Sequence, residues 1–372
     1  TYLFRMEANG SLTLRKTITA EDHDSDDHFG LAVSLSTDKL AIGSQSDSGG
    51  NFFAGAVYLF DLKNEQSAES ILSNLNSIGL YTSSDVHSVV LQTQPSSYAS
   101  TRNYVTGDLS TFGSRTYIAK ENSIGQSPEI SRYWEVYWQV EKLTAYDQSS
   151  SDLYGSSISQ SGDLLAIGAY NDNADGSSRC GSVYLYRVGE NFERTLLSKI
   201  VPFDGIAGDE FGWDLSLDGN ILAISARGAN SLNEVSSVGA VYLYRIELNG
   251  SVTFLEKLYG EGINNRFGHS ISLSKKYLTV SADWADLGSA TRAGAVYLYK
   301  RESNGSVRLL QKLVAPDGAS DEFYGISIDQ SGDLLAVGSV YAVDSQGNKT
   351  GAVYIYRIVG EQVVFLEKLL AS

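Results

Sequence analysis

The chain has few cysteines, few prolines and no long hydrophobic run. Cys180 is its only cysteine, so no disulfide can form within the chain. Only four prolines interrupt the 372 residues, and no apolar stretch approaches the roughly 20 residues that a membrane-spanning helix needs. No window shows the apolar spacing of an amphipathic helix. These absences exclude a small disulfide-stapled domain, a membrane-spanning helix and a helical bundle.

Positive charge is also scarce. The sequence has 28 Lys and Arg against 44 Asp and Glu, a formal net charge of −16. A surface of this sign repels phosphate groups, which argues against nucleic acid or an anionic membrane as a partner. It favours solubility and is compatible with cation binding.

One short phrase occurs five times in the chain. An aromatic-glycine pair precedes each copy, and from Tyr154-Gly155 onward these pairs recur about every 57 residues. Self-similarity at such a period indicates stacked supersecondary units. The copies are GAVYLF from Gly55, GSVYLY from Gly181, GAVYLY from Gly239 and Gly294, and GAVYIY from Gly351.

Each unit contains four runs that favour strands, which we label A to D. Run A follows the aromatic-glycine pair, as in SISLS from Ser270, and run B is an apolar stretch such as DLLAIG from Asp163. Run C is the GAVYLY phrase, and run D is a segment such as VTFLEKL ending at Leu258. Alternating Val, Ile, Leu and Tyr bounded by turn residues is typical of β-strands. The unit has the size of one four-stranded propeller blade.

We therefore expect an all-β fold, a β-propeller of four-stranded blades. The chain supplies five full blades and an outer half, because Thr1 to Phe4 and Leu12 to Ile18 read as C and D strands without A and B strands. One alternative is that this pair forms an open edge, but exposed edges invite aggregation. We expect sequence upstream of Thr1 to complete a ring of six or seven blades, since the chain begins with Thr rather than Met.

With the opening Phe-Gly and the closing Gly-Ala-Val-Tyr, the units resemble FG-GAP repeats, the blade type of the integrin α-subunit head and of many microbial surface proteins. The resemblance covers nearly all of the chain outside one insertion. It implies an integrin α-like propeller used in cell adhesion. Integrin-type blades hold calcium in long acidic A–B loops, but the loops here are as short as QSGD from Gln160, so that ligand set does not transfer.

The insertion interrupts the first blade. Val140 to Leu143 matches a D strand but follows the first C strand after an excess of about 70 residues. This assigns residues 1–63 and 138–372 to the propeller and 64–137 to a small β-rich insertion in a C–D hairpin. Hairpin tips accept added segments at little cost.

Residues 98–137 of the insertion resemble a small chitin- and cellulose-binding type of carbohydrate-binding module. The pattern Tyr104-x-x-Gly-Asp, followed by Tyr-x-Ala, Gly-x-x-Pro and Trp, carries the resemblance. It implies that exposed aromatic rings stack on sugars. The alternative is that these aromatics form the core of the module. The candidate sugar-binding residues are Tyr98, Tyr117, Tyr133, Trp134 and Trp138.

Two acidic features are candidates for calcium. The B–C loop of the second blade places oxygen ligands at Asn171, Asn173 and Asp175 before a glycine, as a calcium loop does at its start. The D–A connections carry further acids, among them Asp204 and Asp317. In both places the alternative is turn chemistry, in which Asp and Asn side chains cap their own backbone.

Four Asn-x-Ser/Thr sequences are candidate glycosylation sites. They are Asn9, Asn249, Asn304 and Asn348. The first three read Asn-Gly-Ser at equivalent hairpin tips, so the turn geometry alone also explains them.

Two surfaces are candidates for recognition. In a four-stranded blade the D–A and B–C connections emerge together, and we call this end of the propeller the D–A/B–C face. Long B–C loops bring Trp284 and Tyr341 to it. We expect this face to be the partner site and the insertion to project from the opposite face or rim.

No catalytic pattern stands out. The four histidines lack metal-binding spacing, and neither a nucleophile elbow nor a phosphate loop occurs. We expect a non-enzymatic extracellular or cell-surface protein that binds protein or glycan partners, or assembles with itself. The alternatives are a lectin acting through the insertion, and a propeller glycoside hydrolase or lyase.

Overall fold

The computed structural model describes most of the chain, and the statements below concern the described residues. Within them, no helix has the length and hydrophobicity that a membrane crossing requires, and the one helical element is the 3-10 turn η1 (Ala174–Gly176). The described residues are 1–6, 12–18, 27–36, 39–47, 53–61, 140–189, 193–231 and 237–370, with short strands between 96 and 136 of which only the backbone is described.

Five four-stranded antiparallel sheets make up most of the fold, which confirms the blades expected from the repeats. Chain neighbours are sheet neighbours, in the order A, B, C, D. Blade 1 contains β3 (Phe29–Leu35), β4 (Lys39–Ser44), β5 (Ala56–Asp61) and β12 (Val140–Leu143). Blade 2 contains β13 (Ser157–Ser161), β14 (Leu164–Ala169), β15 (Ser182–Val188) and β16 (Arg194–Ile200). Blade 3 contains β17 (Phe211–Asp218), β18 (Ile221–Ala226), β19 (Ala240–Ile246) and β20 (Val252–Tyr259). Blade 4 contains β21 (Phe267–Leu273), β22 (Tyr277–Ala282), β23 (Ala295–Arg301) and β24 (Val307–Leu313). Blade 5 contains β25 (Ser327–Ser331), β26 (Leu334–Ser339), β27 (Ala352–Val359) and β28 (Gln362–Leu370).

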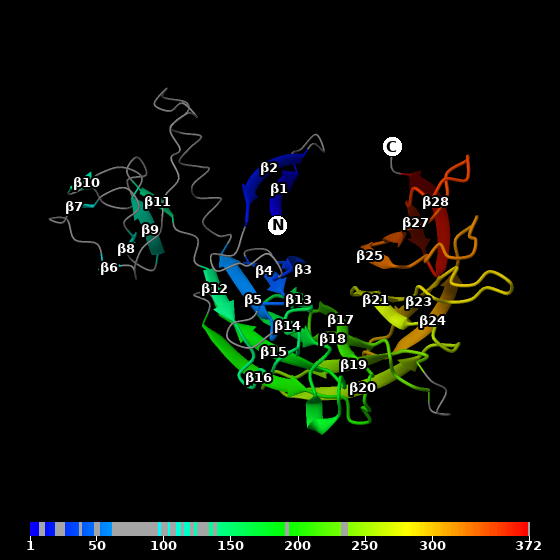
Figure 1. Cartoon of the computed structure of the whole chain (residues 1–372), viewed down its shortest axis with the longest axis horizontal. Coiled ribbons are helices and arrows are strands. Elements are labelled where there is room, and N and C mark those ends of the chain that lie inside the picture. The colour runs from blue at the N-terminus through cyan, green and yellow to red at the C-terminus, as the bar shows by residue number, and fades with distance from the viewer. Residues whose placement is uncertain are drawn as a thin grey trace.

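A two-stranded sheet precedes blade 1, as the outer half-blade expected from the sequence. It pairs β1 (Tyr2–Met6) with β2 (Leu12–Thr17). Figure 1 shows the sheets side by side along an arc, with the A strands toward the centre and the D strands toward the outside. The β1–β2 sheet lies at one end of the arc and blade 5 at the other.

The B strands are buried along their whole length in blades 1 to 4, because each blade packs against a neighbour on both faces. This accounts for apolar runs that do not alternate. Blade 5 differs. Val353 of its C strand is 39% exposed, whereas the corresponding Val296 of blade 4 is 0% exposed. Among the described residues, one face of blade 5 therefore lacks the sheet that covers the same face of the other blades.

The repeated glycine before Ala-Val-Tyr marks the contact between successive blades. Gly239 has a φ of +82°, and a Cβ atom there would lie 2.2 Å from the carbonyl oxygen of Phe267, which opens the next blade. Only glycine permits both the conformation and the approach. Phe267 packs edge-on against Tyr297 of its own blade, with ring centroids 5.3 Å apart. The two landmarks of the repeat thus meet in one contact.

The inserted segment leaves the sheet of blade 1 continuous. β12 pairs directly with β5, with Val140 opposite Phe60, so residues 62–139 lie between two adjacent strands. Strands of the segment form a four-stranded sheet in the order β11-β9-β8-β6 and a two-stranded sheet of β10 and β7. Their bounds are β6 (Ser96–Ser97), β7 (Asn103–Tyr104), β8 (Leu109–Phe112), β9 (Arg115–Ala119), β10 (Ser123–Ile124) and β11 (Trp134–Val136).

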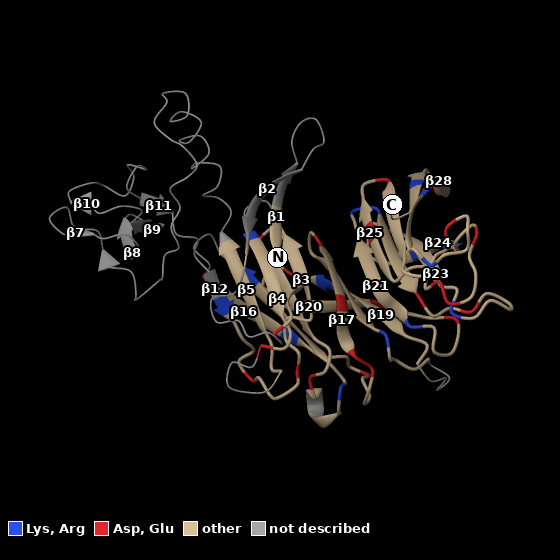
Figure 2. Ribbon diagram, turned by 45° about the horizontal axis from the view of Figure 1, so that its top comes forward, with Lys and Arg blue, Asp and Glu red and all other residues tan. Residues whose placement is uncertain are grey.

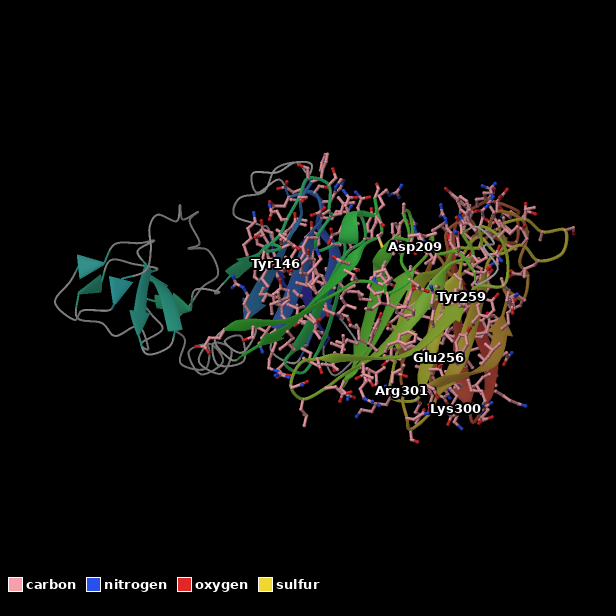
Figure 3. The ribbon with its side chains drawn as sticks, turned by 90° about the horizontal axis from the view of Figure 1, so that it is seen from below. Tyr146, Asp209, Glu256, Tyr259, Lys300 and Arg301 are labelled. Atoms are coloured by element: carbon pink, nitrogen blue, oxygen red, sulfur yellow. The ribbon has the colours of Figure 1, made fainter. Side chains whose placement is uncertain are left out.

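The loops of the propeller divide between two opposite ends of the strands. In Figure 3, Asp209 of a D–A connection lies toward the upper edge, whereas Lys300 and Arg301 at the end of a C strand lie toward the lower edge. Figure 2 shows many of the Lys, Arg, Asp and Glu residues on the loops, and others on strands such as β16 and β17.

Candidate functional site

Boundaries between blades bring two residues of left-handed backbone together on the D–A/B–C face. Between blades 2 and 3, Arg179 and Glu210 have φ values of +54° and +57°, and the Glu210 N–H donates to the Arg179 carbonyl at 3.1 Å. Non-glycine residues seldom adopt this conformation. The same arrangement therefore holds side chains of different chemistry in equivalent places. It recurs as Leu153 with Phe53 and as Phe323 with Arg292.

The acidic residues of the D–A connections are held by the blade that follows. Asp204 accepts a hydrogen bond from the Tyr242 hydroxyl at 2.7 Å and lies 2.8 Å from the ammonium of Lys257. These carboxylates therefore fasten each loop to its own blade. The corresponding groups are Asp147 with Tyr184 and Lys199, Glu261 with Tyr297 and Lys312, and Asp317 with Tyr354 and Lys368. In blade 1, Asp47 of the B–C loop accepts from Tyr58 and pairs with Lys142.

Six side chains on the D–A/B–C face of blades 4 and 5 form what we call the cation–aromatic row. The guanidinium of Arg266 lies 3.4 Å from the ring centroid of Trp284, which is 6.4 Å from the ring of Phe323. Phe323 in turn packs edge-on against Tyr341 at 5.5 Å. The row consists of Arg266, Trp284, Arg292, Phe323, Tyr341 and Lys349.

The remaining two cations of the row also lie on aromatic rings. Arg292 is 5.6 Å from the Phe323 ring and 6.0 Å from the Trp284 ring, and Lys349 is 5.2 Å from the Tyr341 ring. Tyr341 is 47% exposed and Lys349 is exposed. Cation–π contacts of this kind stabilise the side chains while their outer edges stay accessible.

Backbone and side-chain hydrogen bonds fix the loops that carry the row. The Arg292 N–H donates to Asp286 at 2.8 Å, and the Asp321 N–H donates to the Thr291 carbonyl at 2.9 Å. In blade 5, Asp344 accepts from the Asn348 backbone N–H at 2.8 Å. These loops are therefore ordered without a ligand, which lowers the entropy cost of binding.

A pocket of about 240 Å³ lies at the blade 3 end of the row. Arg266 and Trp284 line it together with Arg227, whose guanidinium stacks 3.0 Å from the ring centroid of Trp213. Arg227 also donates to Glu210 at 2.6 Å. By contrast, the guanidinium of Arg266 makes no hydrogen bond to a described residue, and the nearest carboxylate described lies 3.7 Å from it.

That carboxylate belongs to Asp283, which is fully buried. Its oxygens make no hydrogen bond within the described part of the chain, and His269 Nδ1 lies 3.6 Å from one of them. Burial raises the pKa of Asp283 to about 6. Burial, together with Arg227 and Arg266, lowers the pKa of His269 to about 4. The histidine is therefore neutral at pH 7. The Asp283 carboxylate is the negative charge that lies next to the Arg266 guanidinium.

A second hollow, of about 680 Å³, lies along the inner strands. It is lined by Tyr170, Asp214 and the residues that follow the aromatic-glycine pairs. Burial raises the pKa of Asp214 to about 6. The residues after the pairs differ in every blade, so the inner wall is not uniform. They are Leu31, Ser156, Trp213, His269 and Ile326.

The residues of the predicted calcium loop make contacts with neighbouring backbone. Asn171 donates its amide to the Ser151 carbonyl, and Asn173 Oδ1 accepts the Arg179 N–H at 3.0 Å. The side chain of Asp175 lies outside the described residues. Where the structure describes side chains, no group of three or more His, Cys, Asp or Glu is placed to hold a metal. Calcium at Asn171, Asn173 and Asp175 stays a prediction.

The candidate glycosylation sites fall in two settings. Asn249 and Asn304 are exposed at C–D hairpin tips, where each Oδ1 accepts from the N–H and hydroxyl of the serine two residues on. Asn348 lies on the B–C loop of blade 5, and its amide donates to Asp344 at 2.9 Å. Asn9 is outside the described residues. Modification at these sites stays a prediction.

Two of the predicted sugar-binding aromatics lie on neighbouring strands. Tyr117 of β9 pairs with Val136 of β11, and Trp134 of β11 pairs with Ala119 of β9. Nothing is described of their side chains, and Tyr98, Tyr133 and Trp138 lie outside the described residues. Sugar binding by this set is therefore untested.

Four segments match the FG-GAP repeat family, and together they cover more than half of the chain. They are residues 12–60, 137–186, 195–244 and 308–356. The chain belongs to the FG-GAP repeat family. Each match begins within three residues of the start of a D strand and reaches the C strand of the next blade, so the family's unit is offset from the blade by one strand. Four matched units therefore each contain the junction that precedes one blade, namely blades 1, 2, 3 and 5.

Among the solved structures that are similar to this chain, one is matched over the whole of it. It is the periplasmic gluconolactonase PpgL of Pseudomonas aeruginosa, with 13% sequence identity, a TM-score of 0.43 and 92% of its own chain covered. No curated protein matches the sequence.

The sequence predicted that Trp284 and Tyr341 lie on the D–A/B–C face. It did not predict that Arg266, Arg292 and Lys349 contact these rings, or that Phe323 lies between them. Arg266 and Phe323 each stand directly before an aromatic-glycine pair. That position differs in every repeat, in contrast to the repeated pair beside it, and this variation was the available signal. The residues there are His28, Leu153, Glu210, Arg266 and Phe323.

Proposed function

We propose that this FG-GAP repeat protein is a non-enzymatic recognition protein that binds a partner through the D–A/B–C face of its propeller, outside the cell or at the cell surface. The observation that carries the proposal is the cation–aromatic row on ordered loops. Aromatic and arginine side chains are enriched at the centres of binding interfaces because they bury a large area with little loss of entropy.

A scaffold of equivalent positions with different side chains also favours recognition. Glu210, Arg266 and Phe323 occupy the same left-handed position in successive blades. Glu210 is buried, whereas Arg266 and Phe323 are partly exposed, so the side chain that this position offers to a partner changes from blade to blade. The partner is a protein, a glycan or a second copy of the chain, used in adhesion or fibre assembly.

Substitutions in the cation–aromatic row test the proposal. Arg292→Glu and Tyr341→Ala should each weaken binding on glycan and matrix-protein arrays, or self-association in sedimentation, by about tenfold or more. The control is Lys276→Glu on the opposite face, where the side chain is 70% exposed. Equal binding by Arg292→Glu and Lys276→Glu, or no binding and no self-association by the parent chain, contradicts the proposal.

A second candidate function is a lectin that acts through the insertion, alone or beside the propeller face. The Tyr104-x-x-Gly-Asp pattern and the aromatics that follow it favour this role. Trp134→Ala or Tyr98→Ala should then abolish binding to chitin or cellulose oligomers. Unchanged binding by both variants, while the propeller variants lose it, assigns recognition to the propeller.

A further inference from the structure

We propose that the cation–aromatic row and the pocket at its blade 3 end bind an acidic polysaccharide, whose sugar carboxylates pair with Arg266 and Arg227. This inference rests on the proposed function and names the ligand class of the same face.

The first step concerns the guanidinium of Arg266. It is held flat on Trp284 at 3.4 Å, and no described carboxylate is within hydrogen-bond distance of it. Arg227 stacks in the same way on Trp213, and the one described acid bonded to it is Glu210. A stacked guanidinium keeps the N–H groups along its edge available, in a plane that matches a carboxylate. The pocket therefore presents two oriented donors to an anion.

The second step concerns local charge. Among the described residues, the ion pairs of Arg179, Arg227 and Arg266 at this end of the row are made with two acids, Glu210 and Asp283, and His269 is neutral at pH 7. An excess of positive charge here is notable in a chain with a formal net charge of −16. It selects for an anionic group at this place rather than over the whole surface.

The third step concerns size and polarity. The pocket of about 240 Å³ is smaller than the roughly 300 Å³ at which sites for drug-sized ligands begin. It accommodates one acidic unit of a longer molecule, and the row leads away from it along blades 4 and 5. The ring centroids of Trp284, Phe323 and Tyr341 follow one another at 6.4 and 5.5 Å. Such a series supports successive sugar rings, whose C–H faces pack on aromatic surfaces.

Acids within the site distinguish a sugar acid from other anions. Glu210 lines the pocket, and Asp321 lies 2.6 Å from Arg292 while remaining partly exposed. Carboxylates are acceptors only, so a ligand that approaches them must bring donors. The hydroxyl groups of a uronic acid supply these beside its carboxylate. A polyglutamate side chain and a phosphodiester backbone supply only the negative charge.

The test uses the full chain and a short oligogalacturonate, titrated by calorimetry and tryptophan fluorescence in buffer with a chelator. We expect saturable binding that Arg266→Gln weakens by about tenfold or more and that Lys349→Gln weakens by a smaller factor. Arg308→Gln, which removes the same charge from an exposed D-strand site, should leave the affinity within about twofold. Lys349 is exposed, so its variant remains informative if Arg266→Gln fails to fold.

Three further ligands complete the experiment. A neutral glucan oligomer should bind at least about tenfold more weakly, and a polyglutamate peptide and single-stranded DNA should also bind more weakly than the oligogalacturonate. Equal binding by either polyanion overturns the sugar-acid assignment, as does the absence of galacturonate binding at millimolar concentration and low salt. If the array or sedimentation signal still depends on Arg292 and Tyr341 in that case, recognition by the face stands and only its ligand class falls.

Discussion

Lys257 and Asp204 form an ion pair of 2.8 Å between the D strand of blade 3 and the loop that enters the same blade. The ammonium also lies 4.4 Å from the ring centroid of Tyr242, whose hydroxyl donates to the other oxygen of Asp204. One carboxylate thus joins the loop to two strands. Because the group recurs in other blades, the loops of the D–A/B–C face are fixed by the repeat itself.

Removing the hydroxyl from this group should destabilise the protein. Tyr242→Phe leaves one oxygen of Asp204 without its donor, and we expect the free energy of unfolding to fall by about 1–2 kcal/mol. Chemical denaturation followed by circular dichroism measures the change. Tyr146→Phe is the control, because Tyr146 is 68% exposed and should cost almost nothing. Equal stability of the two variants would show that the Tyr242 hydroxyl contributes nothing to the free energy of unfolding.

Two glycines with similar backbone conformations should differ in how much an alanine substitution destabilises the protein, because only one of them lies at a crowded blade junction. Gly239 has a φ of +82° and Gly219 a φ of +61°, but a Cβ atom would meet Phe267 at the first and open space at the second. Gly219→Ala should cost about 1 kcal/mol from backbone strain. Gly239→Ala should cost more than about 3 kcal/mol or prevent folding, because the blades must separate. Thermal melting of both variants measures this difference in stability. Similar melting temperatures would contradict the prediction.

The free energy of unfolding should depend on pH through Asp152. Burial raises its pKa to about 6, and it is 2% exposed. An unfolded aspartate has a pKa of about 3.9. The folded state therefore takes up the proton first, and this group's contribution to stability increases as pH falls from about 7 to about 4.

Asp152→Asn removes that dependence while keeping an oxygen to accept the Ser149 N–H. We expect the variant to be more stable than the parent by about 1–3 kcal/mol at pH 8, with the difference shrinking toward pH 4. Denaturation curves at both pH values measure it. A difference that does not change with pH would mean that Asp152 is ionised alike in both states.

Calcium can be tested at Asn173. Its side-chain oxygen accepts the Arg179 N–H, a bond that needs no metal. Asn173→Ala should therefore lower the melting temperature by the same amount with a chelator and with millimolar calcium, corresponding to about 1 kcal/mol. A loss confined to the calcium sample would instead support a metal at Asn171, Asn173 and Asp175.

The blades could be predicted because two short sequence features, the aromatic-glycine pair and the glycine before Ala-Val-Tyr, meet in the same contact between successive blades. Gly239 before Ala-Val-Tyr and Phe267 before Gly268 are far apart in sequence, yet each is required by the other's position. Any chain that repeats both must bring successive sheets together in the same way. The strand order and the buried B strands repeat with that contact, whereas the half-blade of β1 and β2 was predicted because Thr1 to Phe4 and Leu12 to Ile18 resemble C and D strands.

The cation–aromatic row could not be predicted to the same degree. The stack of Arg266 on Trp284 depends on a left-handed φ of +55° at Arg266 and on the path of a B–C loop. Neither local propensity nor hydrophobic alternation encodes these. Arg292 and Phe323 meet only because two blades adjoin, so their contact is a property of the assembled arc.

The pairing of β5 with β12 has a consequence for how such chains diversify. The two strands remain hydrogen-bonded neighbours, so the polypeptide leaves and re-enters blade 1 about 4.8 Å apart. Any compact unit whose own ends adjoin can be spliced there without altering the strand order of the host sheet. Blade 1 can therefore gain or lose such a segment while β5 and β12 keep their pairing.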